Sequence, residues 1–426
     1  MIIVDTALKK RYEESNPVRV AVIGAGYMGR GVVLQVVTAV PGMEVVAVYN
    51  RTLATAGKAY EQAGISDVES VSSVGQLEDA IKKGRYTITD DPMLVCQAEG
   101  IDVVIEVTGE VEFGAHVVLE AIKHKKHVVL MNAELDAVVG PILKVYADRE
   151  GVVLTNADGD QPGVIMNLYR YVKMIGCKPV LCGNIKGLQD PYRTPETQRA
   201  YAEQYKQKTQ MVTSFADGTK ISMEMAVVAN ATGFKVGQRG MTGYKCDHVD
   251  DTLDLYPVDE LLKKGWVDYI LGAKPPGGIF VLAYHDNPIQ QQYMNYYKLG
   301  NGPLYVFYNP YHVCHLEVPI TAARAELFHD AAIAPIGGPL VDVVATAKRD
   351  LKAGETLDSI GGFMAYGQAE NYDMSKAENL MPISLLEGCI VKHDISKDTV
   401  LTYADVEVPE GRLVDKLRLE QDEYFN

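Results

Sequence analysis

A lysine flanked by glycines is the first candidate for chemistry in this sequence. Lys186 lies in the segment GNIKG (183–187), at the end of an apolar run that predicts a strand. An ammonium group can stabilise negative charge that develops on a carbonyl oxygen during a reaction. Lys186 is therefore a candidate catalytic residue, and Asn184 is a candidate substrate-binding residue. The alternative is an ordinary solvated lysine.

Two aspartates precede this segment in the loop DGDQPG (158–163). Asp158 and Asp160 could relay a proton or bind Mg²⁺ or Mn²⁺, so both are candidate catalytic residues. Alternatively, they belong to a turn in which an aspartate caps the following helix. Asp190 and Arg193 closely follow the lysine segment and are candidate substrate-binding residues. The guanidinium could bind a carboxylate or a phosphate, or it could form a surface ion pair.

A glycine pattern near the N-terminus predicts a dinucleotide site. The sequence GAGYMG (24–29) follows an apolar run at 18–23 and precedes a helix-like stretch. In such a unit the first glycine permits a tight turn, the second lets the backbone approach a pyrophosphate, and the third allows close helix packing. Amides at the start of the helix can bind phosphate oxygens. The predicted cofactor contacts in this turn are Gly24, Gly26, Tyr27, Met28 and Gly29.

The end of the next predicted strand bears on which dinucleotide is bound. That strand, at 43–49, is followed by Asn50 and Arg51, where an acidic residue commonly binds the adenosine ribose. No carboxylate is present to repel a 2′-phosphate, and Arg51 could pair with one. The sequence therefore favours NADP, with NAD as the other possibility. If Asn50 merely caps the next helix, the preference stays open.

Two further strand ends should converge on the same edge of the predicted sheet. Thr108 and Gly109 follow the apolar run at 101–107, and Asn132 follows the run at 127–131. Ligands of such sheets bind at the carboxyl ends of the strands. We therefore predict that all three residues contact the cofactor, with Asn132 beside the nicotinamide. A helix cap is the alternative.

The elements that must hold these residues alternate between short apolar strands and helices. This alternation predicts an α/β fold with a doubly wound parallel sheet, a Rossmann domain, over residues 1–157. Residues 158–338 are expected to form an α+β domain for substrate binding or oligomerisation, in which Asp217-Gly218 is a hairpin-turn signal. Residues 339–426 are expected to form a small β-rich domain, followed by a charged tail from about residue 409.

Two other segments could carry function. The basic, glycine-rich stretch from Lys235 to Lys245 is either a mobile loop over an anionic substrate or a flexible connection. The sequence HVCH (312–315) looks like a metal cluster, but on a strand His312 and Cys314 would face one way and His315 the other. The spacing matches no common zinc pattern, so we interpret it as packing.

The net charge and the composition of the chain argue against several classes of binding partner. The 426-residue chain has a net charge of −15, which argues against broad binding to nucleic acids or anionic membranes. Its six cysteines form no C-x-x-C pair, and its start lacks the apolar core of a signal peptide. No apolar stretch approaches the ~18 residues of a membrane span. We therefore expect a cytoplasmic protein that acts on a small molecule, with no nucleic-acid or membrane partner. The sheet and helix surface expected of the middle region predicts a homo-oligomer.

Several motifs together resemble those of the homoserine dehydrogenase-like oxidoreductases. They are the glycine turn, EVTG (106–109), KHVVLMN (126–132) and NIKG (184–187). The segment DLKAGETL (350–357) is similar to part of a SAF domain, a small β-rich module. NIKGLQDPYRTPETQ and MVTSFADGTKIS resemble a subgroup that includes the 1-deoxy-D-xylulose 5-phosphate reductoisomerase-like enzymes. That resemblance implies rearrangement of a phosphorylated ketose and reduction of the resulting aldehyde, with NADPH and a divalent metal.

One departure from the pattern bears on the activity. Homoserine dehydrogenases have a lysine directly after the asparagine matched by Asn132, whereas this chain has Ala133. Homoserine oxidation is therefore a secondary alternative. We expect an NAD(P)-dependent oxidoreductase that transfers a hydride to or from a small polyol, ketose or carbonyl compound, which could be phosphorylated. A non-catalytic NAD(P)-binding sensor or assembly protein, with the SAF-like region as its interaction module, is the alternative of a different class.

Overall fold

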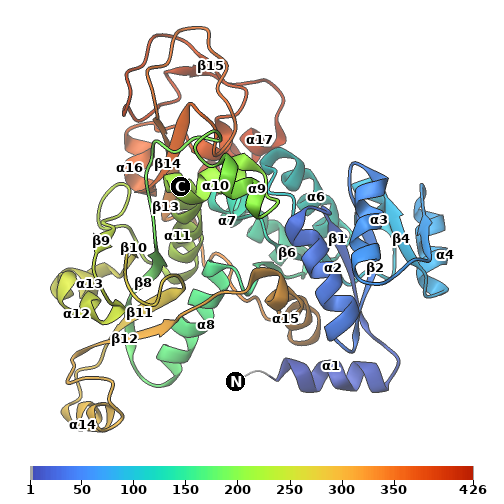
Figure 1. The fold of residues 1–426 in the computed structure, drawn as a ribbon, viewed down its shortest axis with the longest axis horizontal. Coiled ribbons are helices and arrows are strands. Elements are labelled where there is room, and N and C mark those ends of the chain that lie inside the picture. The colour runs from blue at the N-terminus through green and yellow to red at the C-terminus, as the bar shows by residue number, and fades with distance from the viewer. Residues whose placement is uncertain (1–2, 426) are drawn as a thin grey trace. The chain divides into compact units, whose positions relative to one another are not determined.

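The computed structural model describes residues 3–425, which form two compact units (Figure 1). The first unit comprises the chain up to Asp160, together with Val313–Ala334 and Lys416–Glu420. The second comprises Gln161–His312, Pro335–Asp415 and the residues from Gln421 onward. Both units are therefore discontinuous in sequence, which the alternation of strands and helices did not predict.

The first unit is built on a seven-stranded sheet in the order β3-β4-β2-β1-β5-β6-β7, and every strand pair in it is parallel. The apolar composition of the central strands suits burial on both faces. This confirms the predicted doubly wound sheet. The strands are β1 (Val18–Ile23), β2 (Met43–Tyr49), β3 (Val68–Ser70), β4 (Tyr86–Thr89), β5 (Val103–Glu106), β6 (His127–Leu130) and β7 (Leu154–Asn156).

Recognisable start signals position the helices of the first unit. Ser73 accepts a hydrogen bond from the Gln76 amide at the start of α4, and Asp91 accepts one from Met93 before Pro92 opens α5. The helices are α1 (Val4–Glu13), α2 (Tyr27–Ala39), α3 (Leu53–Gln62), α4 (Val74–Lys82), α5 (Pro92–Gln97), α6 (Val111–Lys123), α7 (Ala133–Glu150) and α15 (Cys314–Phe328).

Helix α15 comes from a distant part of the sequence but packs on α2. A Cβ at Gly31 of α2 would lie only 2.7 Å from Cδ2 of His315, so the glycine permits the close approach of the two helices. Val318, Ala322 and Ala323 of α15 are fully buried in the same core as the central strands. His315 therefore contributes to packing, and it lies on a helix and not on a strand.

The second unit contains a five-stranded mixed sheet in the order β12-β11-β8-β10-β9. Strands β8, β9 and β10 are parallel, whereas β11 is antiparallel to both β8 and β12. These strands are β8 (Lys178–Lys186), β9 (Tyr244–Lys245), β10 (Trp266–Leu271), β11 (Ile279–Tyr284) and β12 (Leu304–Asn309). The helices of this region are α8 (Gln161–Met174), α9 (Arg199–Gln204), α10 (Thr209–Asp217), α11 (Thr219–Thr232), α12 (Thr252–Leu255), α13 (Val258–Lys264) and α14 (Pro288–Tyr296), with a 3₁₀ turn at Val249–Asp251.

The hairpin predicted at Asp217-Gly218 is wrong. The pair joins two helices, α10 and α11, and Gly218 has φ of 93° at this junction. The Asp217 carboxylate accepts a hydrogen bond from the Thr219 amide at 2.8 Å and so stabilises the start of α11. An Asp-Gly pair supplies a positive φ to either kind of turn, and only the flanking segments decide which one forms.

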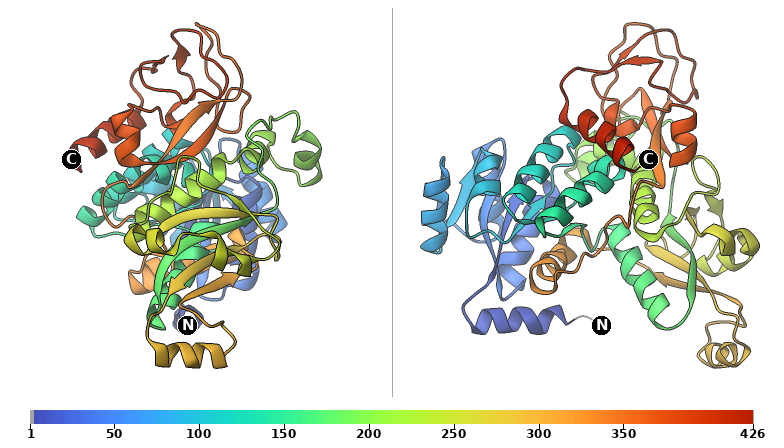
Figure 2. Two further views of the ribbon diagram at one scale, coloured as in Figure 1. Left: turned by 90° about the vertical axis from the view of Figure 1, so that its left-hand side faces the viewer. Right: turned by 180° about the vertical axis from the view of Figure 1, so that it is seen from behind.

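Two antiparallel strand pairs form the C-terminal part of the second unit. Strand β13 (Val341–Ala347) pairs with β14 (Ala365–Asn371), and β15 (Ile390–Val391) pairs with β16 (Val406–Glu407). The orange strands β13 and β14 lie beside the green helix α11 in Figure 1 and in both views of Figure 2. Short helices follow at α16 (Tyr372–Ala377) and at a 3₁₀ turn, Ile383–Leu385.

The predicted charged tail is also wrong, because the chain ends in helix α17 (Leu413–Tyr424). Its apolar residues Val414 and Leu417 are each 2% exposed, and Gln421 is fully buried. Charged residues on the other face of the helix gave this segment the composition of a tail, although its apolar residues recur at helical spacing.

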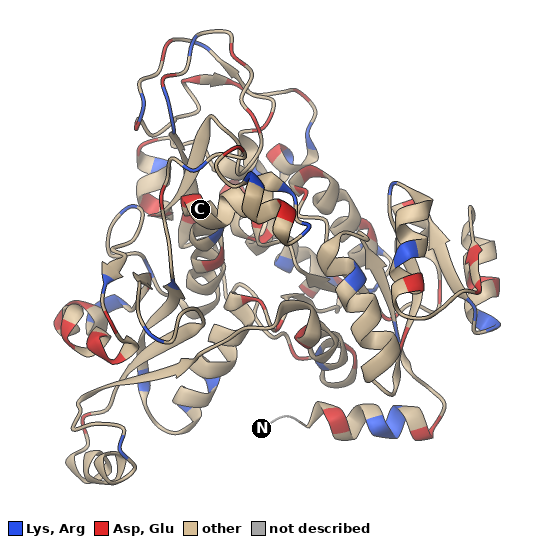
Figure 3. Ribbon diagram, viewed as in Figure 1, with Lys and Arg blue, Asp and Glu red and all other residues tan. Residues whose placement is uncertain are grey.

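Acidic and basic residues are interspersed over most elements of both units (Figure 3). All six cysteines, which lie within the described residues, are free thiols. Among residues 3–425, no helix has both the length and the apolar content needed to cross a bilayer. The absence of nucleic-acid and membrane partners stays a prediction.

Candidate dinucleotide site and flanking residues

The glycine turn between β1 and α2 has the geometry that its sequence predicts. Gly24 has φ of 109°, a conformation that favours glycine. A Cβ on Gly29 would lie 1.9 Å from the carbonyl oxygen of Gly24, so only glycine allows the helix to approach the strand this closely. In contrast, a Cβ on Gly26 would meet nothing within 4 Å. The backbone at Gly26 is thus open to a ligand.

The first residues of α2 present backbone amides at this open side. Gly26 occupies the N-cap position and has no side chain to cap the helix. Tyr27 begins the helix and is exposed, and Met28 is partly exposed. An uncapped helix N-terminus with free access can bind the phosphate oxygens of a dinucleotide. The predicted contacts at Tyr27 and Met28 are compatible with this placement.

Asn50 connects the end of β2 to the glycine turn. Its Oδ1 accepts a hydrogen bond from the Ala25 amide at 3.3 Å, and its Nδ2 donates one to the carbonyl oxygen of Thr52 at 3.1 Å. Thr52, and not Asn50, occupies the N-cap of α3. Arg51 is exposed beside the turn. The structure thus holds Asn50 against the predicted pyrophosphate loop and leaves the Arg51 guanidinium accessible.

A buried carboxyl group, which the sequence interpretation missed, joins the next two strand ends. Glu106, the last residue of β5, is fully buried. Its Oε1 accepts hydrogen bonds from the Thr108 amide at 2.7 Å and from the Thr108 hydroxyl, and its Oε2 accepts one from Asn132 Nδ2 at 2.7 Å. Burial raises the pKa of Glu106 to about 7, although these three donors act in the opposite direction.

Asn132 is the cap of α7, as the alternative from sequence suggested. Its Oδ1 accepts a hydrogen bond from the Leu135 amide at 3.1 Å, while its Nδ2 donates to Glu106 and to the Glu110 carbonyl oxygen. The side chain is fully buried. Thr108 and Gly109 are partly exposed, and Gly109 has φ of 70°. Asn132 therefore fixes the ends of β5 and β6, and direct cofactor contact by these three residues stays a prediction.

Asp158 is bound by a cation that the sequence interpretation did not single out. Arg324 of α15 places Nη1 at 3.0 and 3.2 Å from the two carboxylate oxygens of Asp158. The Thr321 hydroxyl donates to the same carboxylate at 3.2 Å and accepts from the Asp158 amide at 2.7 Å. Arg324 also binds Asp330. The side chain of Asp158 is 1% exposed, so this carboxylate supports the docking of α15.

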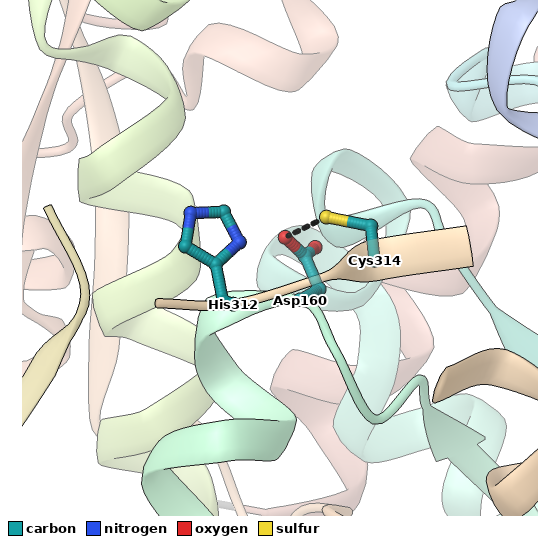
Figure 4. Close-up of side chains that lie close together, drawn as sticks. All are labelled: Asp160, His312 and Cys314. Atoms are coloured by element: carbon teal, nitrogen blue, oxygen red, sulfur yellow. Dashed lines mark hydrogen bonds between the residues drawn. The ribbon is translucent and has the colours of Figure 1, made fainter. Parts of the chain in front are cut away.

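Asp160 lies at the end of the same loop, against the first turn of α15. Figure 4 shows its carboxylate pointing toward the Cys314 thiol, at 3.9 Å between Oδ1 and Sγ; the figure also draws His312, which belongs to the second unit. A Cβ on Gly159 would lie 2.7 Å from the Cys314 carbonyl oxygen. Burial, with the charge of Asp158 adding, raises the pKa of nearby Glu317.

Asp158 does not fit the Mg²⁺ or Mn²⁺ site that the sequence allowed, whereas metal ligation by Asp160 stays a prediction. These cations prefer several oxygen ligands, and a thiol is a poor ligand for them. Both oxygens of Asp158 are bound by Arg324, and the Cys314 thiol contacts Asp160. A cation at Asp158 would have to displace a buried guanidinium.

In the second unit, Lys186 ends β8 at the carboxyl edge of the parallel strands. Its carbonyl oxygen accepts a hydrogen bond from Gly272 at 2.9 Å, and its side chain is partly exposed. A pocket of about 670 Å³ begins at the next residue. It is lined by Gly187, Leu188, Gln189, Lys245, Cys246, Asp247, Asp251, Leu255, Leu271 and Gly272. This edge is where α/β sheets commonly bind ligands.

Asn184 points to a buried carboxylate on α11. Its Nδ2 donates a hydrogen bond to Glu224 Oε2 at 3.3 Å, and both side chains are almost fully buried. Lys220, one turn earlier on α11, is 7% exposed. Sequence reasoning missed Lys220 and Glu224, although two charged residues four positions apart within an otherwise apolar helix were the available signal.

Asp190 and Arg193 form an ion pair with each other, at 3.0 Å between Oδ2 and Nε. Both side chains are more than a third exposed, so the pair leaves the guanidinium accessible to a ligand. The basic stretch that begins at Lys235 is also held by ion pairs. Lys235 binds Asp373 at 2.8 Å, and Arg239 binds both Glu370 and Glu378 at 2.6 Å. These pairs fasten the stretch to β14 and α16.

Three family models match successive parts of the chain. Residues 18–130 match the GFO/IDH/MocA oxidoreductase family, NAD-binding Rossmann fold. Residues 159–318 match the catalytic domain of oxidoreductase DRL, and residues 342–407 match the SAF domain. A curated homoserine dehydrogenase from Bacillus subtilis (strain 168) is 34% identical over 87 residues, which are 20% of this chain. The chain spans only 18% of the length of that enzyme.

Two dehydrogenases are among the solved structures to which the chain is similar. A probable dehydrogenase from Thermotoga maritima is 12% identical, with a TM-score of 0.41 over 75% of this chain and 90% of that one. Apo scyllo-inositol dehydrogenase from Lactobacillus casei is 11% identical, with a TM-score of 0.41 over 73% of this chain and 87% of that one.

The family matches agree with the geometry of the first unit and with the strand pairs of the C-terminal region. They confirm the SAF domain predicted from DLKAGETL, whereas the homoserine dehydrogenase-like and reductoisomerase-like resemblances rest on the sequence motifs. Successive parts of the chain thus match a GFO/IDH/MocA-type NAD-binding domain, a DRL-type oxidoreductase catalytic domain and a SAF domain.

Proposed function

We propose that this protein transfers a hydride between NADP(H) and a small polyol, ketose or related carbonyl compound. The observation that carries the proposal is the turn at Gly24–Gly29, where Gly29 must be glycine for packing but Gly26 has open space around it. A pyrophosphate would use that space. The accessible Arg51, with no acidic residue at the end of β2, supports a preference for NADP over NAD.

We propose Lys186 as the group that stabilises the alkoxide oxygen of the substrate. Its position at the carboxyl end of a parallel strand, next to a pocket, supports this role. The accessible guanidinium of Arg193 is suited to a carboxylate or phosphate, which would admit phosphorylated substrates of the reductoisomerase-like kind. Because Arg324 already binds the Asp158 carboxylate, no step of this proposal is routed through a metal at Asp158.

The direct test measures binding and turnover on the full-length protein. NADPH and NADH are titrated calorimetrically, and a panel of polyols, ketoses and their phosphates is then screened at the reduced-nicotinamide absorbance. We expect tight NADPH binding and turnover of at least one compound. No uptake of either dinucleotide would contradict the proposal, and tight binding with complete inertness would favour a sensor.

A glycine pair makes the binding test specific. Gly26→Ala should leave the thermal stability unchanged, because its methyl group meets no protein atom, but should weaken NADPH binding by crowding the pyrophosphate. Gly75→Ala is the matched control. Its methyl group also meets no atom within 4 Å, and Gly75 does not have a positive φ. If Gly75→Ala and Gly26→Ala bind NADPH equally well, the turn is not the binding site.

The role of Lys186 is tested by Lys186→Ala, with Lys178→Ala at the other end of β8 as the control. The first substitution should lower turnover by roughly a hundredfold or more, as for loss of an oxyanion-stabilising group, while NADPH affinity stays unchanged. The control should retain turnover. Unchanged turnover in Lys186→Ala would remove the assignment.

We also propose that the protein is a homo-oligomer. Helix α14 has no charged residue, and three of its side chains, Ile289, Tyr293 and Tyr296, are 64, 59 and 75% exposed. Such a surface is characteristic of protein–protein contacts. Light scattering after size exclusion should show more than one subunit, and Tyr293→Glu should reduce the mass toward that of a monomer. A monomeric wild-type protein would contradict this proposal.

A further inference from the structure

A buried lysine of the SAF domain reaches into the DRL-type catalytic domain. Lys348 follows β13, within the residues that match the SAF model, and its side chain is 3% exposed. Its ammonium group donates hydrogen bonds to Asp217 Oδ2 at 2.7 Å and to the carbonyl oxygens of Arg193 and Gly362, both at 2.8 Å. All three N–H donors of the ammonium are thereby satisfied inside the protein.

Two of these acceptors belong to segments that are distant in the catalytic domain. Asp217 ends α10 and is fully buried, whereas Arg193 lies in the segment after β8. The same two segments are joined by a backbone hydrogen bond from the Asp190 amide to the Ala216 carbonyl oxygen, at 2.8 Å. Lys348 therefore bridges α10 and the segment that follows Lys186.

A second set of contacts from the SAF domain holds the same segment at its surface. The Tyr192 hydroxyl donates a hydrogen bond to Asp398 Oδ1 at 2.9 Å. The ammonium of Lys397 lies 3.6 Å from the centre of the Tyr192 ring, within the range of a cation–π contact. Tyr192 is thus held from two sides by neighbouring residues of one SAF turn.

The segment held in this way is the one that borders the pocket of the second unit. Gly187, Leu188 and Gln189 line that pocket. Arg193, whose guanidinium is accessible, is the last residue of the segment. A loop without regular structure has many conformations, and each fixed residue costs roughly 1–2 kcal/mol of conformational entropy. Hydrogen bonds from a buried ammonium, together with the Tyr192 contacts, can offset that cost.

We infer that the SAF domain is a positioning module of the enzyme, and that Lys348 is the positioning residue that fixes residues 187–193 for substrate binding. The fixed conformation follows from the contacts of the second unit alone. The role of this conformation in orienting a substrate rests on the function proposed above. The SAF domain is therefore part of the substrate-binding structure and is not a separate interaction module.

The test removes the ammonium without leaving a buried charge. Lys348→Met alone would strand the Asp217 carboxylate, and an unpaired buried charge can prevent folding. The double variant Asp217→Asn/Lys348→Met is neutral at both positions, and the asparagine oxygen can still accept from the Thr219 amide. Lys352→Met is the matched control, because Lys352 belongs to the same domain but pairs with Asp394 at the surface, with side chains 67 and 62% exposed.

Hydrogen exchange of the full-length protein reads out the conformation without a substrate. In the double variant, amides in 187–193 should exchange about tenfold faster or more. The loss of a hydrogen bond from a charged donor raises the equilibrium constant for local opening by about that factor, and the exchange rate rises with it. Amides of β8 should keep their protection, and Lys352→Met should match the wild type. Unchanged exchange at 187–193 in the folded double variant would overturn the inference.

Kinetics separate this inference from the proposed function. With a substrate identified, the double variant should raise KM for that substrate roughly tenfold, with a smaller change in kcat and unchanged NADPH affinity. A loss of protection at 187–193 without any change in KM would refute the link to substrate binding. If the wild type reduces no compound at all, the proposed function fails, while the exchange result still decides whether Lys348 fixes the segment.

Discussion

Glu106 is buried at the end of β5, where it holds Thr108 and Asn132 in place. Its carboxyl group has a pKa of about 7 in the folded protein, compared with an ordinary value of 4.5. The folded state therefore holds this proton more tightly than the unfolded state does. Protonated Glu106 stabilises the fold at acidic pH, and this contribution is lost as pH rises through about 7. Asp136, whose pKa burial also raises to about 7, acts in the same direction.

This sign leads to a measurable pH dependence. Wild-type stability, from urea unfolding, should include a component on the order of 3 kcal/mol that declines as pH rises above the ordinary carboxyl pKa through about 7. Glu106→Gln should remove that component and leave the one from Asp136. Glu61→Gln, on the exposed surface of α3, is the control and should keep the wild-type profile. An identical pH profile in Glu106→Gln would show that the carboxyl is not perturbed.

Arg51 offers a test of cofactor preference at the scale of one residue. Arg51→Ala should weaken NADPH binding by roughly tenfold or more, because a charge-assisted hydrogen bond to the 2′-phosphate is lost. NADH affinity should change little. Arg85→Ala, which removes an exposed arginine paired with Asp67, controls for net charge. An equal effect of Arg51→Ala on both dinucleotides, measured by calorimetry, would contradict the NADP assignment.

At the scale of elements, the fit of α15 against α2 depends on one glycine. Gly31→Ala places a methyl group 2.7 Å from the His315 ring and 3.2 Å from its Cβ, so α15 must shift. We expect a loss of about 1–3 kcal/mol in the free energy of unfolding, as for other overpacked sites. Gly57→Ala in α3 is the matched control, since its nearest atom is 4.0 Å away. The control should gain about 0.5–1 kcal/mol from helix propensity. Equal stability changes would mean that α15 is not docked on α2.

The sequence predicted those elements that have an unambiguous period. Buried parallel strands such as β1 and β2 are continuous apolar runs, and their order follows from the fingerprint that joins them. The prediction from sequence failed at Asp217-Gly218, because an Asp-Gly pair suits both a hairpin turn and a junction between helices. It also failed at α17, because the exposed charged residues outnumber the narrow stripe of apolar residues. A local sequence pattern does not show which distant segment of the chain will pack on the element that it forms.

The site residues show the same limit more sharply. The glycine turn was predictable because its geometry is local to six residues. The partner of Asp158, Arg324, lies more than 160 residues away in sequence, so no spacing could reveal it. In the sequence, Glu106 is only the first residue of the EVTG motif. Its raised pKa comes from burial, which the residue type does not reveal.

At the scale of the whole molecule, α17 contributes residues to both units. Leu417 belongs to the first unit and is 2% exposed, whereas Leu419, two positions later, is 64% exposed. Leu417→Ala should cost about 2–4 kcal/mol, while Leu419→Ala should stay within about 0.5 kcal/mol of the wild type. Thermal unfolding of both variants distinguishes a packed helix from a free tail, which would make the two substitutions equally silent.

The discontinuity of the first unit bears on how the protein is made. Its sheet is complete in sequence by residue 160, but α15 and residues 416–420 are synthesised much later. A ribosome adding roughly 5–20 residues per second would hold the nascent sheet for many seconds with the α15-facing side of α2 uncovered. The face of α2 that α15 covers therefore stays open until α15 has been synthesised, and the first unit is complete only once residues 416–420 have joined it.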